Sequence, residues 1–277
     1  MVDIPMKWRV GHAEQKGREP DEFVPSAVPG AVQIDWAAAK NIPDWNREDN
    51  FKAYRWMEDC FWIYRAEIPK TDLHADEELL FSCGGIDYKY DVYLNGEMIY
   101  AYEGMFRPFE LDVGKAAENG GELAITIYPI PKTPDGTPDT REEARESCKP
   151  AVSYGWDWHP RLVPSGIWDE TTLRVVKKER ILRAEVRYTL SDDLKSASIT
   201  VESAIGTAAG RDRANANAVG ADSAYSEGGN SANAVDVDGI ATAPHALLRF
   251  RLYAPDGKLA LESTELDKPI GLNNPKL

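Results

Sequence analysis

Short runs in which apolar and polar residues alternate recur along the chain between Gly, Pro and Asn residues. A period of two is typical of antiparallel strands that bury one face. The clearest runs are residues 62–68, 78–83, 90–94 and 123–127. We therefore expect an antiparallel β-sandwich from about residue 23 to residue 178. Its predicted core contains Trp62, Phe81, Val92, Leu94 and Ile125.

The dipeptide Asn95-Gly96 lies between the apolar runs 91–94 and 98–100. It predicts a β-hairpin, because a type I′ turn needs positive φ at both central residues. Helical patterning is short and confined to residues 140–147 and 36–40.

Alternation resumes after residue 181, which predicts a second β unit. Its expected strands are residues 183–190, 197–202 and 247–253. Between them, residues 206–244 consist largely of Ala, Gly, Asn, Ser and Asp, with Tyr225 as the central aromatic residue. This composition buries too little apolar surface to offset its ordering entropy, so we expect a mobile loop, with a functional lid as the alternative. We place the domains at residues 1–178 and 179–277.

Composition restricts the partners. The 277 residues suffice for two domains, and 46 acidic against 32 basic residues give a net charge of −14. This charge opposes binding to nucleic acid or to an anionic membrane, whereas a neutral sugar suits it. The start of the chain lacks the pattern of a signal peptide and no apolar run has the length of a membrane span, so we expect a cytoplasmic protein.

The three cysteines, Cys60, Cys83 and Cys148, are widely spaced and form no CxxC pair. No histidine lies near them at the spacing of a metal site. We interpret them as reduced structural thiols and predict neither a metal site nor a cofactor.

The segment GWDWHPRLVPSGIW, residues 155–168, combines three tryptophans, a carboxylate and an arginine. Such a mixture can stack on sugar rings and bind sugar hydroxyls. Packing in the core is the expectation for Trp158 and Trp168. A carboxylate between two indoles must find a partner or face a cleft, so Asp157 has two interpretations: a sugar-binding residue, or a buried ion pair with Arg161. His159 is interpreted as a surface hydrogen bonder.

This segment resembles a signature of glycoside hydrolase family 2, most closely its β-mannosidase branch, where GWDWGPRLV-SGIW closes the first domain. Further blocks resemble the same family in the same order. They are VPGAV at 28–32 as a strand, IPD at 42–44, DN at 49–50, WMEDCFWIY at 56–64 as a strand, FSCGGID at 81–87, VYLNG at 92–96 and GMFRPF at 104–109.

The resemblance implies an all-β protein, with a galactose-binding-like jelly-roll sandwich followed by an incomplete immunoglobulin-like β-sandwich. NPKL at 274–277 resembles a motif that precedes the last strand of that second domain. The chain is then expected to be an amino-terminal fragment. The two catalytic glutamates, about 5 Å apart in a retaining enzyme, would belong to a missing (β/α)₈ barrel, the partner of these domains.

In the family, the residues that match Trp156 and Asp157 help to bind the terminal sugar, so these two are the expected substrate-binding residues. No catalytic residue is expected in this chain, and His159 departs from the family's glycine. The expected function is the non-catalytic part of an exo-acting retaining β-glycosidase, a β-mannosidase, which shapes one wall of the sugar pocket. The alternatives are a β-galactosidase or a β-glucuronidase of the same family, or a stand-alone carbohydrate-binding module.

Overall fold

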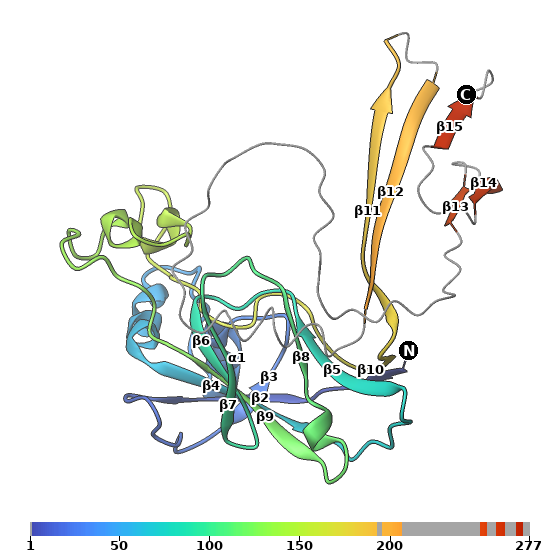
Figure 1. The fold of residues 1–277 in the computed structure, drawn as a ribbon. Coiled ribbons are helices and arrows are strands. Elements are labelled where there is room, and N and C mark those ends of the chain that lie inside the picture. Colours follow the sequence, from blue (N-terminus) through green and yellow to red (C-terminus); the bar gives the residue numbers. More distant parts are fainter. Residues whose placement is uncertain (1, 193–195, 207–249, 254–258, 264–269, 274–277) are drawn as a thin grey trace. The chain divides into compact units, whose positions relative to one another are not determined.

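The chain forms two compact units, which comprise Met1–Lys177 and Lys178–Leu277. The computed structural model describes residues 2–192, 196–206, 250–253, 259–263 and 270–273. The first unit is an antiparallel β-sandwich that also carries short helices (Figure 1). This unit contains the Trp-rich segment of residues 155–168.

One layer of the sandwich is a six-stranded sheet with the order β3-β2-β4-β9-β6-β7. Its strands are β2 (Trp8–Ala13), β3 (Val24–Ser26), β4 (Phe61–Ile68), β6 (Lys89–Leu94), β7 (Glu97–Glu103) and β9 (Gly121–Ile127). Along β9, Leu123, Ile125 and Ile127 are completely buried, whereas Ala124 and Thr126 between them are partly exposed. This alternation turns one face of the sheet into the core.

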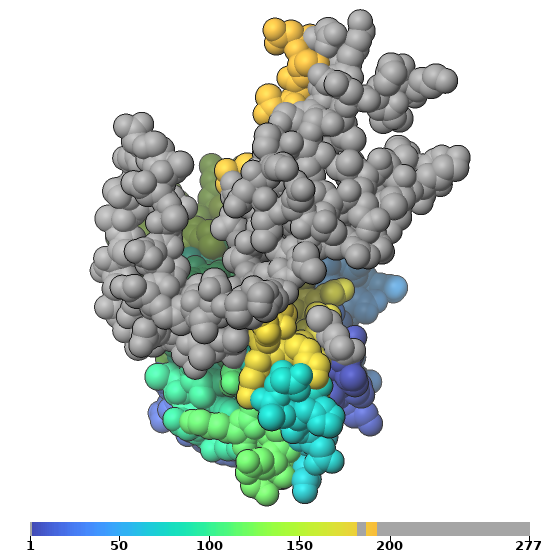
Figure 2. Space-filling view, turned by 45° about the vertical axis from the view of Figure 1, so that its right-hand side comes forward, coloured from blue at the N-terminus to red at the C-terminus, as the bar shows by residue number. Residues whose placement is uncertain are grey.

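The other layer is a four-stranded sheet with the order β1-β10-β5-β8. Its strands are β1 (Val2–Ile4), β5 (Glu77–Cys83), β8 (Phe109–Asp112) and β10 (Thr171–Lys177). The paired strands β5 and β10 lie side by side in cyan and yellow in Figure 2. The core between the layers includes all five residues predicted from the sequence: Trp62, Phe81, Val92, Leu94 and Ile125.

The hairpin predicted at Asn95-Gly96 joins β6 to β7. Asn95 has φ 51° and Gly96 has φ 82°, and Leu94 pairs with Glu97 across the turn. The prediction is confirmed. The side-chain oxygen of Asn95 also accepts a hydrogen bond from the backbone N–H of Glu122, at 2.9 Å, which attaches the turn to β9.

The sandwich begins well before residue 23, so that expectation was wrong. Trp8 and Val10 in β2 are buried. The strand was missed because Arg9, Gly11 and His12 interrupt its apolar pattern. A Cβ atom at Gly11 would lie 2.4 Å from the carbonyl oxygen of Glu22, so the chain passing over β2 leaves no room for a side chain there.

Within the described residues, the helices are short and belong to the first unit. They are α1 (Val32–Lys40) and the 3₁₀ helices η1 (Asn50–Asp59), η2 (Gly114–Ala116), η3 (Arg141–Ala144) and η4 (Ala151–Tyr154). None of the helices in the described residues has the length and apolar character that a membrane crossing requires.

Of the two strands expected from the family resemblance, the one at 28–32 was wrong and the one at 56–64 is confirmed only from Phe61 onward. Residues 28–31 form a loop that leads into α1, because Pro29 cannot donate a ladder hydrogen bond. Residues 56–59 end η1, and β4 starts only at Phe61. The two predicted helices agree better with the structure. Residues 36–40 fall within α1, whereas of residues 140–147 only the short η3 is helical.

The second unit is also made of strands. β11 (Arg180–Leu190), β12 (Ser196–Gly206) and β15 (Ile270–Asn273) form a three-stranded sheet, and β13 (Phe250–Tyr253) pairs with β14 (Leu259–Ser263). β11 and β12 confirm the strands expected at 183–190 and 197–202. The loop predicted at 206–244 lies outside the described residues from 207 onward, as does the NPKL motif. The immunoglobulin-like assignment and the domain limits stay predictions.

Candidate functional site

Trp156 and Asp157 lie on a tight turn at one end of the sandwich. The N–H of Trp156 donates to the carbonyl of His159 at 3.0 Å, and the N–H of His159 donates back at 3.3 Å. Asp157 and Trp158 form the exposed tip. Gly155 enters the turn with φ 116°, a conformation that side-chain-bearing residues rarely adopt, so the turn depends on glycine here.

Trp158 and Trp168 are not core residues, contrary to expectation. Trp158 is 71% exposed, because it occupies the tip of the turn. Trp168 is 38% exposed; it packs on Gly85, where a Cβ atom would lie 2.6 Å from the indole, and its Nε1–H donates to the carbonyl of Met105 at 2.8 Å. His159 is half-buried, with Nδ1 2.6 Å from the carbonyl of Pro160.

The carboxylate of Asp157 is exposed. Within the described part of the chain it has neither a hydrogen bond nor an ion pair, and the alternative pairing with Arg161 is wrong. Arg161 instead meets Glu58: its Nε donates to Oε1 at 3.1 Å and its Nη2 donates to Oε2 at 2.8 Å. Asp157 therefore keeps its acceptor oxygens free for another molecule.

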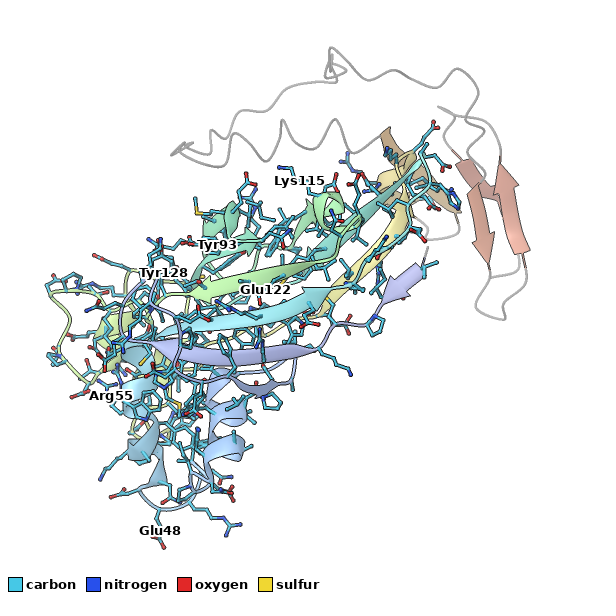
Figure 3. All side chains as sticks on the ribbon, turned by 90° about the horizontal axis from the view of Figure 1, so that it is seen from below. Glu48, Arg55, Tyr93, Lys115, Glu122 and Tyr128 are labelled. Carbon is cyan, nitrogen blue, oxygen red and sulfur yellow. The ribbon has the colours of Figure 1, made fainter. Side chains whose placement is uncertain are left out.

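Glu58, at the end of η1, is the centre of a charged network. Only 3% of its side chain is exposed, and Arg55 Nη1 also donates to both carboxylate oxygens, at 2.8 and 2.7 Å. Lys132 adds a third cation at 3.5 Å. Burial raises the pKa of the Glu58 carboxyl, and Arg55 and Lys132 oppose that shift. Figure 3 shows Arg55, a residue of η1, at the same end of the unit as Tyr128.

Arg161 also connects two other elements to the base of the turn. Its Nη1 donates to the carbonyl of Tyr154 at 3.1 Å and to the carboxylate of Glu143 in η3. The side chains of Arg161 and Glu143 are only 8% and 10% exposed. A buried arginine with several fixed acceptors holds its surroundings in one geometry. Arg161 thereby positions the Trp156–Asp157 turn against η1 and η3.

A second buried ion pair holds the far end of the segment. Lys149 Nζ lies 2.6 and 2.5 Å from the two carboxylate oxygens of Asp87, and donates to the carbonyl of Pro164 at 2.8 Å. The Ser165 hydroxyl donates to the Asp87 carbonyl at 3.2 Å. Burial raises the pKa of Asp87 and lowers that of Lys149, and their mutual attraction opposes both shifts. This pair was not predicted, because no periodicity links residues 62 positions apart.

Sequence reasoning also missed Arg141, the first residue of η3. Its Cζ lies 3.9 Å from the centroid of the Trp156 ring, the distance of a cation–π contact. The exposed face of this end thus combines an indole, a carboxylate and a guanidinium. In the described part of the chain, His, Cys, Asp and Glu form no group of three or more that could hold a metal ion.

The sequence of this region is similar to that of known proteins. Residues 8–169 match the family described as glycosyl hydrolase 2 galactose-binding domain-like. Beta-mannosidase B of Aspergillus clavatus is 28% identical over 210 residues, which cover 70% of this chain and 24% of that protein. Beta-mannosidase B of Emericella nidulans is 30% identical over 197 residues, covering 65% and 23%. The chain thus spans about a quarter of the length of these relatives.

Solved structures agree with this match. The β-D-mannosidase from Dictyoglomus thermophilum superposes with a TM-score of 0.57 at 25% identity, over 74% of this chain and 26% of that one. A beta-glucuronidase from an uncultured Clostridium sp. gives a TM-score of 0.55 at 16% identity, over 98% and 38%. The second similarity concerns the fold alone.

Proposed function

The chain belongs to glycoside hydrolase family 2, through its galactose-binding domain-like region at residues 8–169, and from this premise we propose that it forms the non-catalytic amino-terminal part of an exo-acting retaining β-mannosidase. The named relatives that support this are both beta-mannosidases, and each is about four times as long as the matching region. The rest of such an enzyme would supply the catalytic barrel, the intramolecular partner of these domains.

The observation that carries the proposal is the exposed turn of Trp156 and Asp157 above a buried ion network. Asp157 would accept hydrogen bonds from hydroxyls of the terminal sugar, and Trp156 would give the pocket an apolar wall. Arg161 fixes the base of the turn through Glu58 and Glu143. Preorganisation of this kind is what a binding residue on a loop requires.

The reaction itself belongs elsewhere in the enzyme. A retaining glycosidase needs one carboxylate as nucleophile and a second carboxyl as acid/base, about 5 Å apart. At this end of the first unit, the buried carboxylates of Glu58 and Glu143 both bind Arg161, and Asp87 binds Lys149. All three carboxylates are buried and directed at the protein's own basic side chains. Residues 1–277 alone would not hydrolyse a glycoside.

The proposed substrate is a neutral β-linked mannoside, and neither nucleic acid nor a membrane is a proposed partner. The net charge of −14 supports this choice.

We place the enzyme in the cytoplasm, where reduced thiols persist, because Cys60 and Cys83 are buried free cysteines. Cys148 is also free but exposed, so it is not a buried structural thiol.

A stand-alone carbohydrate-binding module is the second candidate, and the exposed rings of Trp156 and Trp158 favour it. The experiment that separates the two compares the native gene product with residues 1–277 on a nitrophenyl β-mannoside. We expect turnover by the native product and none by residues 1–277. A native product that binds mannan without hydrolysing the mannoside would support the module instead. Turnover of a β-galactoside or β-glucuronide in preference to the mannoside would change the proposed substrate.

A further inference from the structure

Arg141 covers part of the exposed ring of Trp156, the residue that precedes Asp157 in the chain. The guanidinium carbon lies 3.9 Å from the ring centroid, and Trp156 is nevertheless 40% exposed. Arg141 is itself exposed and has neither an ion pair nor a hydrogen bond within the described residues. The neighbouring carboxylate of Glu142 is used elsewhere: it accepts from the N–H and the hydroxyl of Thr137, at 3.0 and 2.5 Å. The donors of Arg141 are therefore available.

The position of Arg141 is built into the fold. Glu143 follows two residues later in η3, and its carboxylate is bound by Arg161. The carbonyl of Glu143 also accepts from the N–H of Thr133 at 2.8 Å. Because Arg161 also holds the carbonyl of Tyr154, one buried side chain fixes both the helix that carries Arg141 and the turn that carries Trp156. The contact between Arg141 and Trp156 follows from this shared anchor.

The two polar groups beside Trp156 are complementary. A carboxylate only accepts hydrogen bonds and a guanidinium only donates them, whereas a sugar hydroxyl does both. We propose that Arg141 is a further substrate-binding residue, which donates to hydroxyl oxygens of the same terminal pyranose that Asp157 binds as an acceptor. This inference rests on the proposed function. Because Arg141 already occupies part of one face of the Trp156 ring, a sugar would contact the part of the ring that stays exposed.

The pairing selects a neutral pyranoside. The carboxylate of a uronide would be attracted by Arg141 but repelled by Asp157, whereas the hydroxyls of a neutral sugar use both groups.

The test uses the native gene product, with Arg141→Gln, Arg141→Lys and Asp157→Asn assayed on nitrophenyl β-mannoside and β-glucuronide. Arg9→Gln is the matched control, because Arg9, on β2, also lies over an aromatic ring, with its Cζ 4.9 Å from the centroid of Phe23. We expect Arg141→Gln to lower kcat/KM for the mannoside roughly ten- to a hundredfold, mainly through KM. Arg141→Lys should keep part of the affinity, and Arg9→Gln should behave like the wild type.

The outcomes separate the two proposals. If Asp157→Asn lowers kcat/KM while Arg141→Gln matches Arg9→Gln, Arg141 does not bind substrate and the proposed function stands. If neither Asp157→Asn nor Arg141→Gln changes kcat/KM, the site at the turn is wrong as a whole. Should Arg141→Gln fail to fold, Arg141→Lys decides: an unchanged KM overturns the inference and a raised KM supports it. A preference for the glucuronide that is lost in Arg141→Gln would replace the neutral sugar by a uronide.

Discussion

The guanidinium of Arg161 donates two hydrogen bonds, 3.1 and 2.8 Å long, to the carboxylate of Glu58, which lies 103 positions earlier in the sequence. Glu58 lies in the last turn of η1, and Arg161 follows the turn that displays Asp157. The pair therefore converts two separate surface segments into one rigid end. Buried ion pairs add little net stability compared with apolar residues, so their main effect here is geometric.

Removal of one partner of this network should be costly. Arg161→Met leaves the carboxylates of Glu58 and Glu143 in a site where they are only 3% and 10% exposed. We expect the free energy of unfolding of the first unit to fall by about 3 to 5 kcal/mol, measured by urea denaturation with tryptophan fluorescence. Arg47→Met is the control, because Arg47 pairs with Asp44 while 76% exposed and should cost less than about 1 kcal/mol. Equal losses in both variants would show that the network is dispensable.

The buried pair of Asp87 and Lys149 allows the coupling between two charges to be measured directly. Their side chains are 4% and 0% exposed. Asp87→Leu and Lys149→Met should each cost about 3 to 5 kcal/mol, because each leaves one buried charge without its partner. The double variant should cost clearly less than the sum, since it leaves no buried charge. A double-mutant cycle by urea denaturation measures the difference, and strict additivity would contradict the coupling.

Period-two alternation was enough to predict the sandwich and its core, and Asn95-Gly96 was enough for the hairpin, because both signals are local. The strand β2 was missed since Gly11 and His12 serve tertiary contacts that interrupt the pattern. At the candidate site, the sequence and its family resemblance indicated Trp156 and Asp157. The partners of Arg161 and the position of Arg141 could not be inferred, because they depend on how distant loops meet at the end of the sandwich.

The environment of His12 predicts loss of stability in acid. Its ring lies among three indoles, with centroids 4.7 Å from Trp36, 4.8 Å from Trp56 and 5.3 Å from Trp62. Among the described residues, its buried Nδ1 has no hydrogen-bond partner. Burial lowers the pKa of His12 below its usual 6.5; the carboxylates of Glu22, Asp21 and Glu14 oppose this, and Lys40 adds to it.

The sign follows from proton uptake. The unfolded chain binds a proton at His12 more readily than the folded chain, so stability is complete above the unfolded pKa of about 6.5 and declines as the pH falls toward the folded pKa. We expect His12→Gln to lose less stability than the wild type between about pH 7.5 and about pH 5. The measurement is urea denaturation at both pH values. His74→Gln, at an exposed histidine, should follow the wild type; identical pH profiles for the wild type and His12→Gln would refute the prediction.

Asp157 should separate binding from folding. Its carboxylate is exposed and has no ion pair or hydrogen bond in the described part of the chain, so Asp157→Ala should change the stability of residues 1–277 by less than about 0.5 kcal/mol. In the native gene product the same change should lower kcat/KM for a nitrophenyl β-mannoside by roughly ten- to a hundredfold, because a hydrogen bond from a sugar hydroxyl to a charged acceptor is lost. Thermal unfolding and steady-state kinetics provide the two measurements. The opposite result, reduced stability with unchanged kinetics, would make Asp157 a structural residue and would leave the exposed turn without a role in the sugar pocket.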